Sequence, residues 1–129
     1  MRAEVELRHE PLETLPLPSF IIDGSCGAVV TFTGTVRSEE ADHPISALIY
    51  EAYEPMAHRQ ILHLLNDLAH RYPVRAVHLR HRLGTIPVGA AAIVLRVESV
   101  HRAEAFAFAT TFMDRFKQDV PIWKTGSLP

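Results

Sequence analysis

The sequence has few cysteines, little net charge and no long hydrophobic run, and each shortage excludes a class of protein. Cys26 is the only cysteine in 129 residues, so no internal disulfide is possible, and a reducing cytoplasm is the expected compartment. A net charge of −2 gives no general attraction to nucleic acid or to an anionic membrane. No apolar run approaches the roughly 20 residues of a membrane span, and the first residues lack the apolar segment of a signal peptide.

The composition that is present is that of one globular domain. Hydrophobic residues make up 47% of the chain and charged residues 22%, which is the ordinary balance for such a domain. A chain of this length can bury a core without disulfides or metals to hold it together. We therefore expect residues 1–129 to form a single domain.

Hydrophobic patterning predicts five strands and two helices. Alternating apolar residues or clustered β-branched residues indicate strands over residues 3–9, 27–36, 46–53, 74–82 and 90–100. Apolar residues at helical spacing predict one helix over 55–71 and a second that begins at His101. Pro121 has no N–H to donate, so it ends the second helix. Hairpins interleaved with two helices indicate an α+β domain with a mostly antiparallel sheet.

The connecting segments carry predictions of their own. Prolines between residues 11 and 18 exclude regular structure, and Ser19 can cap a short turn or helix through Ile22. Residues 38–44 are polar and are expected to form a long loop that joins the strands on either side into a hairpin. Residues 83–89 are a turn-rich connection, and Gly34 indicates a bulge or a close backbone approach.

Two lysines, Lys117 and Lys124, stand on either side of the end of the second helix. Ile122 and Trp123 are expected to pack against another part of the protein, and the packing of Trp123 is expected to turn Lys124 back toward Lys117. A lysine held beside apolar side chains loses hydration and can act as a proton donor, base or nucleophile. The alternative is a pair of solvated surface lysines, because lysine is rarely buried.

Three further cations suit an anionic ligand. Arg37 follows a glycine-containing strand and offers a planar fork for phosphate or carboxylate. His101 and Arg102 open the second helix, where the helix dipole disfavours cations but favours bound anions. Solvated side chains are the alternative for all three. Together with the two lysines, this set suits an anionic substrate and proton-transfer chemistry.

The eight histidines do not predict a metal site. His78 and His81 would point to opposite faces of a strand. His63 and His70 could share a helix face, but no Cys, Asp or Glu completes a set at zinc spacing. Cys26 has no activating neighbour, and a serine hydrolase motif is missing.

Several stretches, taken in order across residues 27–124, resemble the MoaE family, the large catalytic subunit of molybdopterin synthase. The matching stretches are 27–37, 50–53 with Met56, 81–84 with Pro87 and Gly89, His101–Arg102 with Ala105 and Phe106, Asp114 with Lys117, and 121–124. No single stretch is decisive, but the ordered series is specific.

The resemblance implies an α/β hammerhead-type fold and a homodimer that forms the core of a heterotetramer. Each end would bind a small ubiquitin-like sulfur carrier (MoaD-like), whose C-terminal Gly-Gly thiocarboxylate enters the active site. The implied activity is that of a sulfurtransferase in molybdenum cofactor biosynthesis. It would convert cyclic pyranopterin monophosphate to molybdopterin by installing a dithiolene, with no metal or cofactor on this subunit.

The resemblance also implies site residues. The catalytic lysines of the family fall on Lys117 and Lys124, which would also contact the substrate. The other substrate contacts fall on Arg37, His101 and Arg102, on the backbone at Thr35 and Val36, and on Thr125 and Gly126 after the second lysine.

The length of the second helix separates two parts of this set. About 16 residues between His101 and Lys117, at roughly 1.5 Å each, span about 24 Å. We therefore expect a composite site in which one protomer supplies His101 and Arg102 and the other supplies the lysines.

Two other readings stay open. A non-catalytic MoaE-like module would hold the carrier or a pterin phosphate without turnover; its support is Gly126, where the family usually has an acidic residue, and the short segment after it. A phosphoester-binding regulatory domain is a third reading. Retention of both lysines favours the enzyme.

Overall fold

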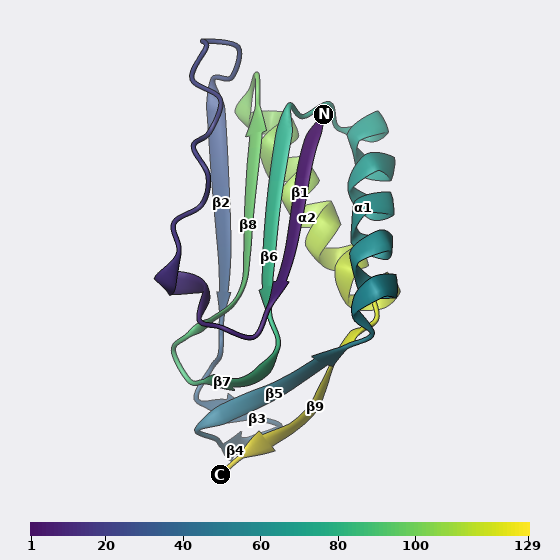
Figure 1. Ribbon diagram of the computed structural model, residues 1–129. Helices are drawn as coiled ribbons and strands as arrows, with labels where there is room; N and C mark the ends of the chain where they lie inside the picture. Colours follow the sequence, from purple (N-terminus) through teal and green to yellow (C-terminus); the bar gives the residue numbers. More distant parts are fainter.

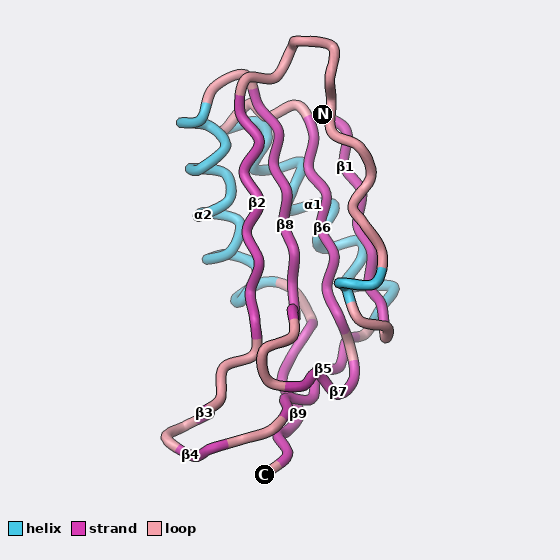
Figure 2. The backbone as a smooth tube through the Cα atoms, turned by 90° about the vertical axis from the view of Figure 1, so that its left-hand side faces the viewer, coloured by secondary structure: helices cyan, strands magenta, loops and turns pink.

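A four-stranded sheet covered on one face by two helices forms the larger part of the protein. The computed structural model describes all residues from Met1 to Pro129. The strands, in their order across the sheet, are β1 (Arg2–Arg8), β6 (Ala76–Arg82), β8 (Ala91–Ser99) and β2 (Ala28–Thr35). Both helices, α1 (Glu54–Arg71) and α2 (Arg102–Asp119), lie on the same side of it (Figures 1 and 2). Only β1 and β6 pair in parallel, so the predicted α+β class with a mostly antiparallel sheet is confirmed.

A second, three-stranded sheet lies at the end of the first, next to the C-terminal end of α2 (Figure 1). Its strands, in spatial order, are β7 (Gly84–Pro87), β5 (Ala47–Ala52) and β9 (Ile122–Leu128). A short ribbon of β3 (Glu39–Glu40) and β4 (His43–Pro44) stands beside it, and a single 3-10 turn, η1 (Leu12–Thr14), follows β1. The junction between the two sheets positions the candidate site.

The main core fills the space between the four-stranded sheet and the helices. Phe108 and Phe112 of α2 and Leu65 of α1 meet Leu79 of β6 and Leu95 of β8, and all five side chains are fully buried. Burial of side chains of this size is worth ~1.5–3 kcal/mol each.

Neither helix has the length and apolarity needed to cross a membrane.

The opposite face of the large sheet carries buried polar groups that hold the segment between β1 and β2. Glu98 accepts a hydrogen bond from the Ile21 N–H at 2.6 Å, and Arg80 donates to the Leu15 carbonyl at 2.6 Å. The Glu13 carboxylate accepts from the Ala91 N–H at 2.8 Å. These bonds satisfy groups that would otherwise be costly to bury.

Three predictions about connections need correction. The strands 27–36 and 46–53 do not form a hairpin, because β2 pairs with β8 while β5 pairs with β7 and β9 in the other sheet. Residues 83–89 contain a short strand, β7. No helix forms at Ser19–Ile22, where the Ile21 N–H is bonded by Glu98 instead of by a helical turn.

The prediction for Gly34 is confirmed. The register of β2 against β8 shifts between Gly34 and Thr35. A Cβ at position 34 would lie 2.8 Å from Cγ2 of Ile93, so only glycine fits without movement of its neighbour. The bulge turns the last residue of β2, Thr35, toward the junction of the two sheets.

Candidate active site

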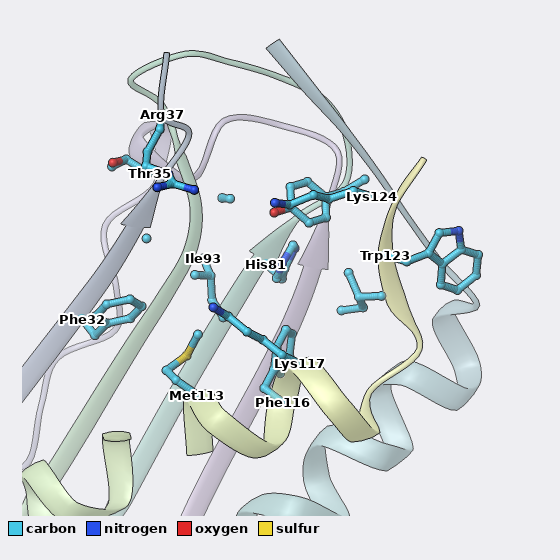
Figure 3. A pocket seen from close by; sticks show the side chains of 14 residues that line it. Phe32, Thr35, Arg37, His81, Ile93, Met113, Phe116, Lys117, Trp123 and Lys124 are labelled. Atoms are coloured by element: carbon cyan, nitrogen blue, oxygen red, sulfur yellow. The ribbon is translucent and has the colours of Figure 1, made fainter. Parts of the chain in front are cut away.

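A cavity of about 560 Å³ opens where the end of α2 meets the two sheets (Figure 3). Its apolar walls include Phe32 of β2, Ile93 of β8, Met113 and Phe116 of α2, and Ile122 of β9. Three cationic residues share the cavity with them. Such a volume with flat apolar walls and a few charged groups is typical of a small-molecule site.

The chain has only two lysines among its 13 lysines and arginines, and both line this cavity. Lys117 comes from the last turn of α2, and Lys124 from β9. Arg37, just beyond β2, lines the cavity on a different wall, and Figure 3 shows it across the opening from Lys117. The structure therefore brings both lysines and Arg37 together within one chain.

Strand pairing, rather than the packing of Trp123, positions Lys124. Trp123 belongs to the lining of the cavity, but 46% of its surface is exposed, so its packing alone does not hold Lys124. Ile122 does pack against the core. Lys124 lies opposite Tyr50 in the β5–β9 ladder, and a register shift between Ile49 and Tyr50 interrupts that ladder.

Lys124 has one acidic neighbour. Its Nζ lies 3.3 Å from Oε2 and 3.4 Å from Oε1 of Glu40 on β3. Glu40 is not among the residues that line the cavity. Three cations therefore line a cavity without a carboxylate, an arrangement that attracts an anionic ligand.

Thr35 and Val36, the predicted residues that precede Arg37, contribute less to the cavity. Thr35 lines the cavity. Val36 is 4% exposed, its N–H donates to the Ala90 carbonyl at 3.0 Å, and its own carbonyl accepts from the Gly89 N–H at 2.9 Å. Its backbone is thus already paired and is not available for a ligand.

Thr125 and Gly126 continue β9 and do not line the cavity. The Thr125 hydroxyl donates to the Ile49 carbonyl across the ladder at 3.4 Å. Both residues are exposed. A role for them in ligand binding stays a prediction.

His101 and Arg102 lie at the opposite end of α2 from Lys117. His101 is the residue before the helix and makes no side-chain capping hydrogen bond. It is exposed, lines a separate shallow depression with Arg75, and its Nδ1 is 4.0 Å from Oε2 of Glu104. Within one chain, these two residues do not reach the cavity of the lysines, as the helix length predicted.

Two cavity residues, Tyr50 and His81, were not predicted as site residues. Burial raises the pKa of the Tyr50 hydroxyl, an effect that the nearby charge of Lys124 opposes and that of Glu40 reinforces. His81 is 3% exposed, and burial lowers the pKa of its imidazole to about 4. The sequence did contain an indication of the role of His81. Val77, Leu79 and His81 lie on the same, helix-facing side of β6, so a histidine stands where the alternation calls for an apolar residue.

The histidine pattern produces no metal site. His78 lies on the other face of the sheet from His81, as predicted, with its ring nitrogens 3.1 Å from Glu4 and 2.8 Å from Glu6. No group of three or more His, Cys, Asp or Glu side chains is arranged to hold a metal ion. The cavity offers cations, aromatic walls, the hydroxyl-bearing side chains of Thr35 and Tyr50, and a neutral imidazole.

Known proteins share this fold and much of this sequence. The family model described as MoaE protein matches residues 7–119. A molybdopterin synthase catalytic subunit from Thermoplasma volcanium is 35% identical over 96% of this chain and 90% of its own length. The subunit of the same name from Rattus norvegicus is 36% identical over 93% of this chain, but the chain spans only 60% of that relative's length.

Solved structures agree. The crystal structure of molybdopterin synthase from Staphylococcus aureus superposes with a TM-score of 0.81 at 30% identity, over 95% of this chain and 93% of that one. A complex of subunits 1 and 2 of molybdopterin-converting factor from Helicobacter pylori, at 18% identity and a TM-score of 0.69, shares the fold over 98% of this chain and 88% of that one. Because the family model covers most of the chain and a relative of similar length is more than 30% identical, the chain belongs to the MoaE family.

Proposed function

We propose that this chain is the catalytic subunit of a molybdopterin synthase. It would transfer sulfur from the thiocarboxylated C-terminus of a small ubiquitin-like carrier to cyclic pyranopterin monophosphate. The observation that carries the proposal is that both lysines of the chain line one cavity together with Arg37. The names of the relatives support the same activity.

The cavity suits the proposed substrate. The flat apolar side chain of Phe32 provides a surface for a pterin ring, and the Arg37 guanidinium provides a planar fork for its phosphate. Lys117 and Lys124 can stabilise negative charge that develops on the reacting oxygens and move protons. No metal is required for these roles.

The chemistry balances without an external oxidant or reductant. In each transfer a C–S bond forms on the pterin side chain and the acyl C–S bond of the carrier breaks. Water supplies the oxygen with which each carrier leaves as a carboxylate. Of the two oxygens displaced from the pterin side chain, one leaves as water and the other stays on the phosphate, whose cyclic ester opens to a monoester. The lysine ammonium groups would donate the protons that these leaving oxygens need. Cys26 is a free thiol that the reaction does not use, and it suits the cytoplasm in which we place the reaction.

The carrier and a second copy of this chain are the partners that the proposal requires. The Helicobacter pylori structure is a complex of two different subunits, which supports a carrier-bound assembly. His101 and Arg102 stand a full helix length from Lys117. A composite site, in which a second protomer brings this pair to the cavity, would give the phosphate further cationic partners.

A reconstituted assay with thiocarboxylated carrier and cyclic pyranopterin monophosphate tests the proposal. Lys117→Ala and Lys124→Ala should each abolish molybdopterin formation. Arg59→Ala, which removes an exposed cation from α1, is the matched control and should keep wild-type turnover. Binding of substrate without turnover by the wild-type chain would favour the non-catalytic module instead.

A further inference from the structure

His81 is a buried polar side chain at the floor of the cavity. It is the last residue of β6 that points toward the helices, after Val77 and Leu79, which belong to the main core. Its ring stacks on Phe116 with centroids 5.7 Å apart and meets Tyr50 edge-on at 5.2 Å. All three side chains line the cavity, where Figure 3 shows His81 among the labelled residues. Aromatic neighbours on two sides hold the imidazole in one orientation.

The hydrogen bonds of His81 determine which ring nitrogen carries the proton. Nδ1 lies 2.7 Å from the carbonyl oxygen of Arg82. A carbonyl oxygen only accepts, so Nδ1 is the donor and carries the hydrogen. Because burial keeps the ring neutral at physiological pH, Nε2 is left with an unprotonated lone pair.

Nε2 faces the cavity without a partner in the protein. It makes no hydrogen bond, and it is not among the fully enclosed polar atoms that lack one. It is therefore reached from the cavity that His81 lines. A polar atom in this position is costly to leave unpaired when a ligand excludes water.

The lone pair differs in kind from the charged groups around it. Arg37, Lys117 and Lys124 offer only N–H donors. His81 offers a fixed acceptor below them. A ligand that pairs with these three cations and with His81 combines an anionic group with an N–H or O–H donor.

We propose that His81 binds the substrate directly, with Nε2 accepting a hydrogen bond from a ring N–H or O–H of the bound heterocycle. This inference rests on the proposed function, since a pterin ring carries such N–H groups. His81 would select substrates that present a donor at this point, as buried polar groups discriminate against analogues that lack the matching group. It adds a neutral acceptor to the cationic groups that were predicted for this site.

Two variants distinguish the role of Nδ1 from the role of Nε2 in the His81 ring. In His81→Asn, the side-chain NH₂ can still donate to the Arg82 carbonyl, but nothing replaces Nε2. In His81→Gln, the longer side chain can place its oxygen near the position of Nε2 while the bond to Arg82 is lost. We expect His81→Asn to weaken binding of cyclic pyranopterin monophosphate about tenfold or more, and His81→Gln to recover at least part of that loss.

Binding is measured by isothermal titration with the full chain, and turnover is measured separately. Equal affinity of wild type and a folded His81→Asn would overturn the role of His81, whereas binding without turnover in wild type would overturn only the proposed function. Absence of any binding by wild type would overturn both.

A spectroscopic readout does not depend on the variants folding. In ¹⁵N-labelled wild type, the Nε2 resonance of His81 should move toward lower frequency when the pterin binds, as expected for a nitrogen that accepts a hydrogen bond. An unchanged Nε2 resonance in the saturated complex would overturn the proposal, because a purely structural histidine would not respond.

Discussion

The ammonium of Lys124 and the carboxylate of Glu40 form an ion pair between residues 84 positions apart in the chain, with Nζ 3.3 Å from Oε2. Glu40 stands on the β3–β4 ribbon, whose turn residues Ala41 and Asp42 both have positive φ. The family usually has an acidic residue two positions after the second lysine, where this chain has Gly126. The ribbon brings the carboxylate of Glu40 to that lysine instead. The carboxylate orients the ammonium at the edge of the cavity.

Removal of this charge should impair turnover modestly. Both side chains are partly exposed, and exposed ion pairs contribute ~0.2–1 kcal/mol. Glu40→Gln should therefore lower kcat/KM about two- to fivefold, and the difference from wild type should shrink at high salt. The neighbouring Glu39→Gln removes an exposed charge from the same ribbon without touching Lys124. A similar loss in Glu39→Gln would show that the charge of the ribbon, and not this pair, matters.

A composite site should be recoverable by mixing two inactive proteins. Suppose that one protomer supplies Arg102 and the other supplies Lys117. In a heterodimer of one Arg102→Ala chain and one Lys117→Ala chain, the two active sites then differ from each other. One site carries both substitutions and the other carries neither. Subunit exchange should then restore up to about a quarter of wild-type turnover, since half of the dimers are mixed and half of their sites are intact. Mixed dimers detected by native mass spectrometry that remain inactive would argue for a site within one chain.

The elements were predictable because hydrophobic periodicity is a local property. The first helix was expected over 55–71 and spans Glu54–Arg71, and Pro121 follows the end of the second as expected. Strand pairing is not local: Ala28 pairs with Ser99, and Tyr50 pairs with Lys124. A hairpin between neighbouring strands was the wrong choice because nothing in the loop 38–44 shows that its two ends enter different sheets.

The site was predictable to the extent that its chemistry is rare in the sequence. Lys117, Lys124 and Arg37 stand out as cations beside proline, glycine and aromatic residues, and they meet in one cavity. His81 did not stand out, because its role depends on a tautomer set by the Arg82 carbonyl and on an opening that forms only where the end of α2 meets the two sheets. Whether a residue faces the core or a cavity is decided by the whole fold.

A backbone contact at Gly27 predicts a stability effect. A Cβ at this position would lie 2.7 Å from the carbonyl oxygen of Val100, which also accepts the Gly27 N–H at 3.2 Å. Gly27→Ala must therefore displace main chain at the start of the β2–β8 ladder, and we expect a loss of about 1–3 kcal/mol in the free energy of unfolding.

Gly126→Ala is the matched control for that measurement. Its Cβ would meet only Cδ1 of Ile49 at an ordinary 3.9 Å, so its free energy of unfolding should change by less than about 1 kcal/mol. Urea denaturation followed by circular dichroism gives both values. Equal destabilisation of the two variants would mean that the loss of glycine itself, and not the Val100 carbonyl, is responsible.

The neutral state of His81 predicts how stability depends on pH. The pKa of His81 in the folded protein is about 4, below its ordinary value of 6.5. Between these values the unfolded chain binds more protons than the folded one, so stability falls as pH drops from 6.5 toward 4 and is unaffected by this group at higher pH. From pH 7 to pH 5 the expected loss from this residue is about 2 kcal/mol.

Urea unfolding of wild type and His81→Gln at both pH values isolates this contribution, because the other titrating groups are common to the two proteins. The variant should lose about 2 kcal/mol less than wild type on acidification. Parallel losses in the two proteins would mean that His81 becomes protonated without unfolding. In that case Nε2 would carry a proton in the folded protein at pH 5, and its role as an acceptor would be confined to higher pH.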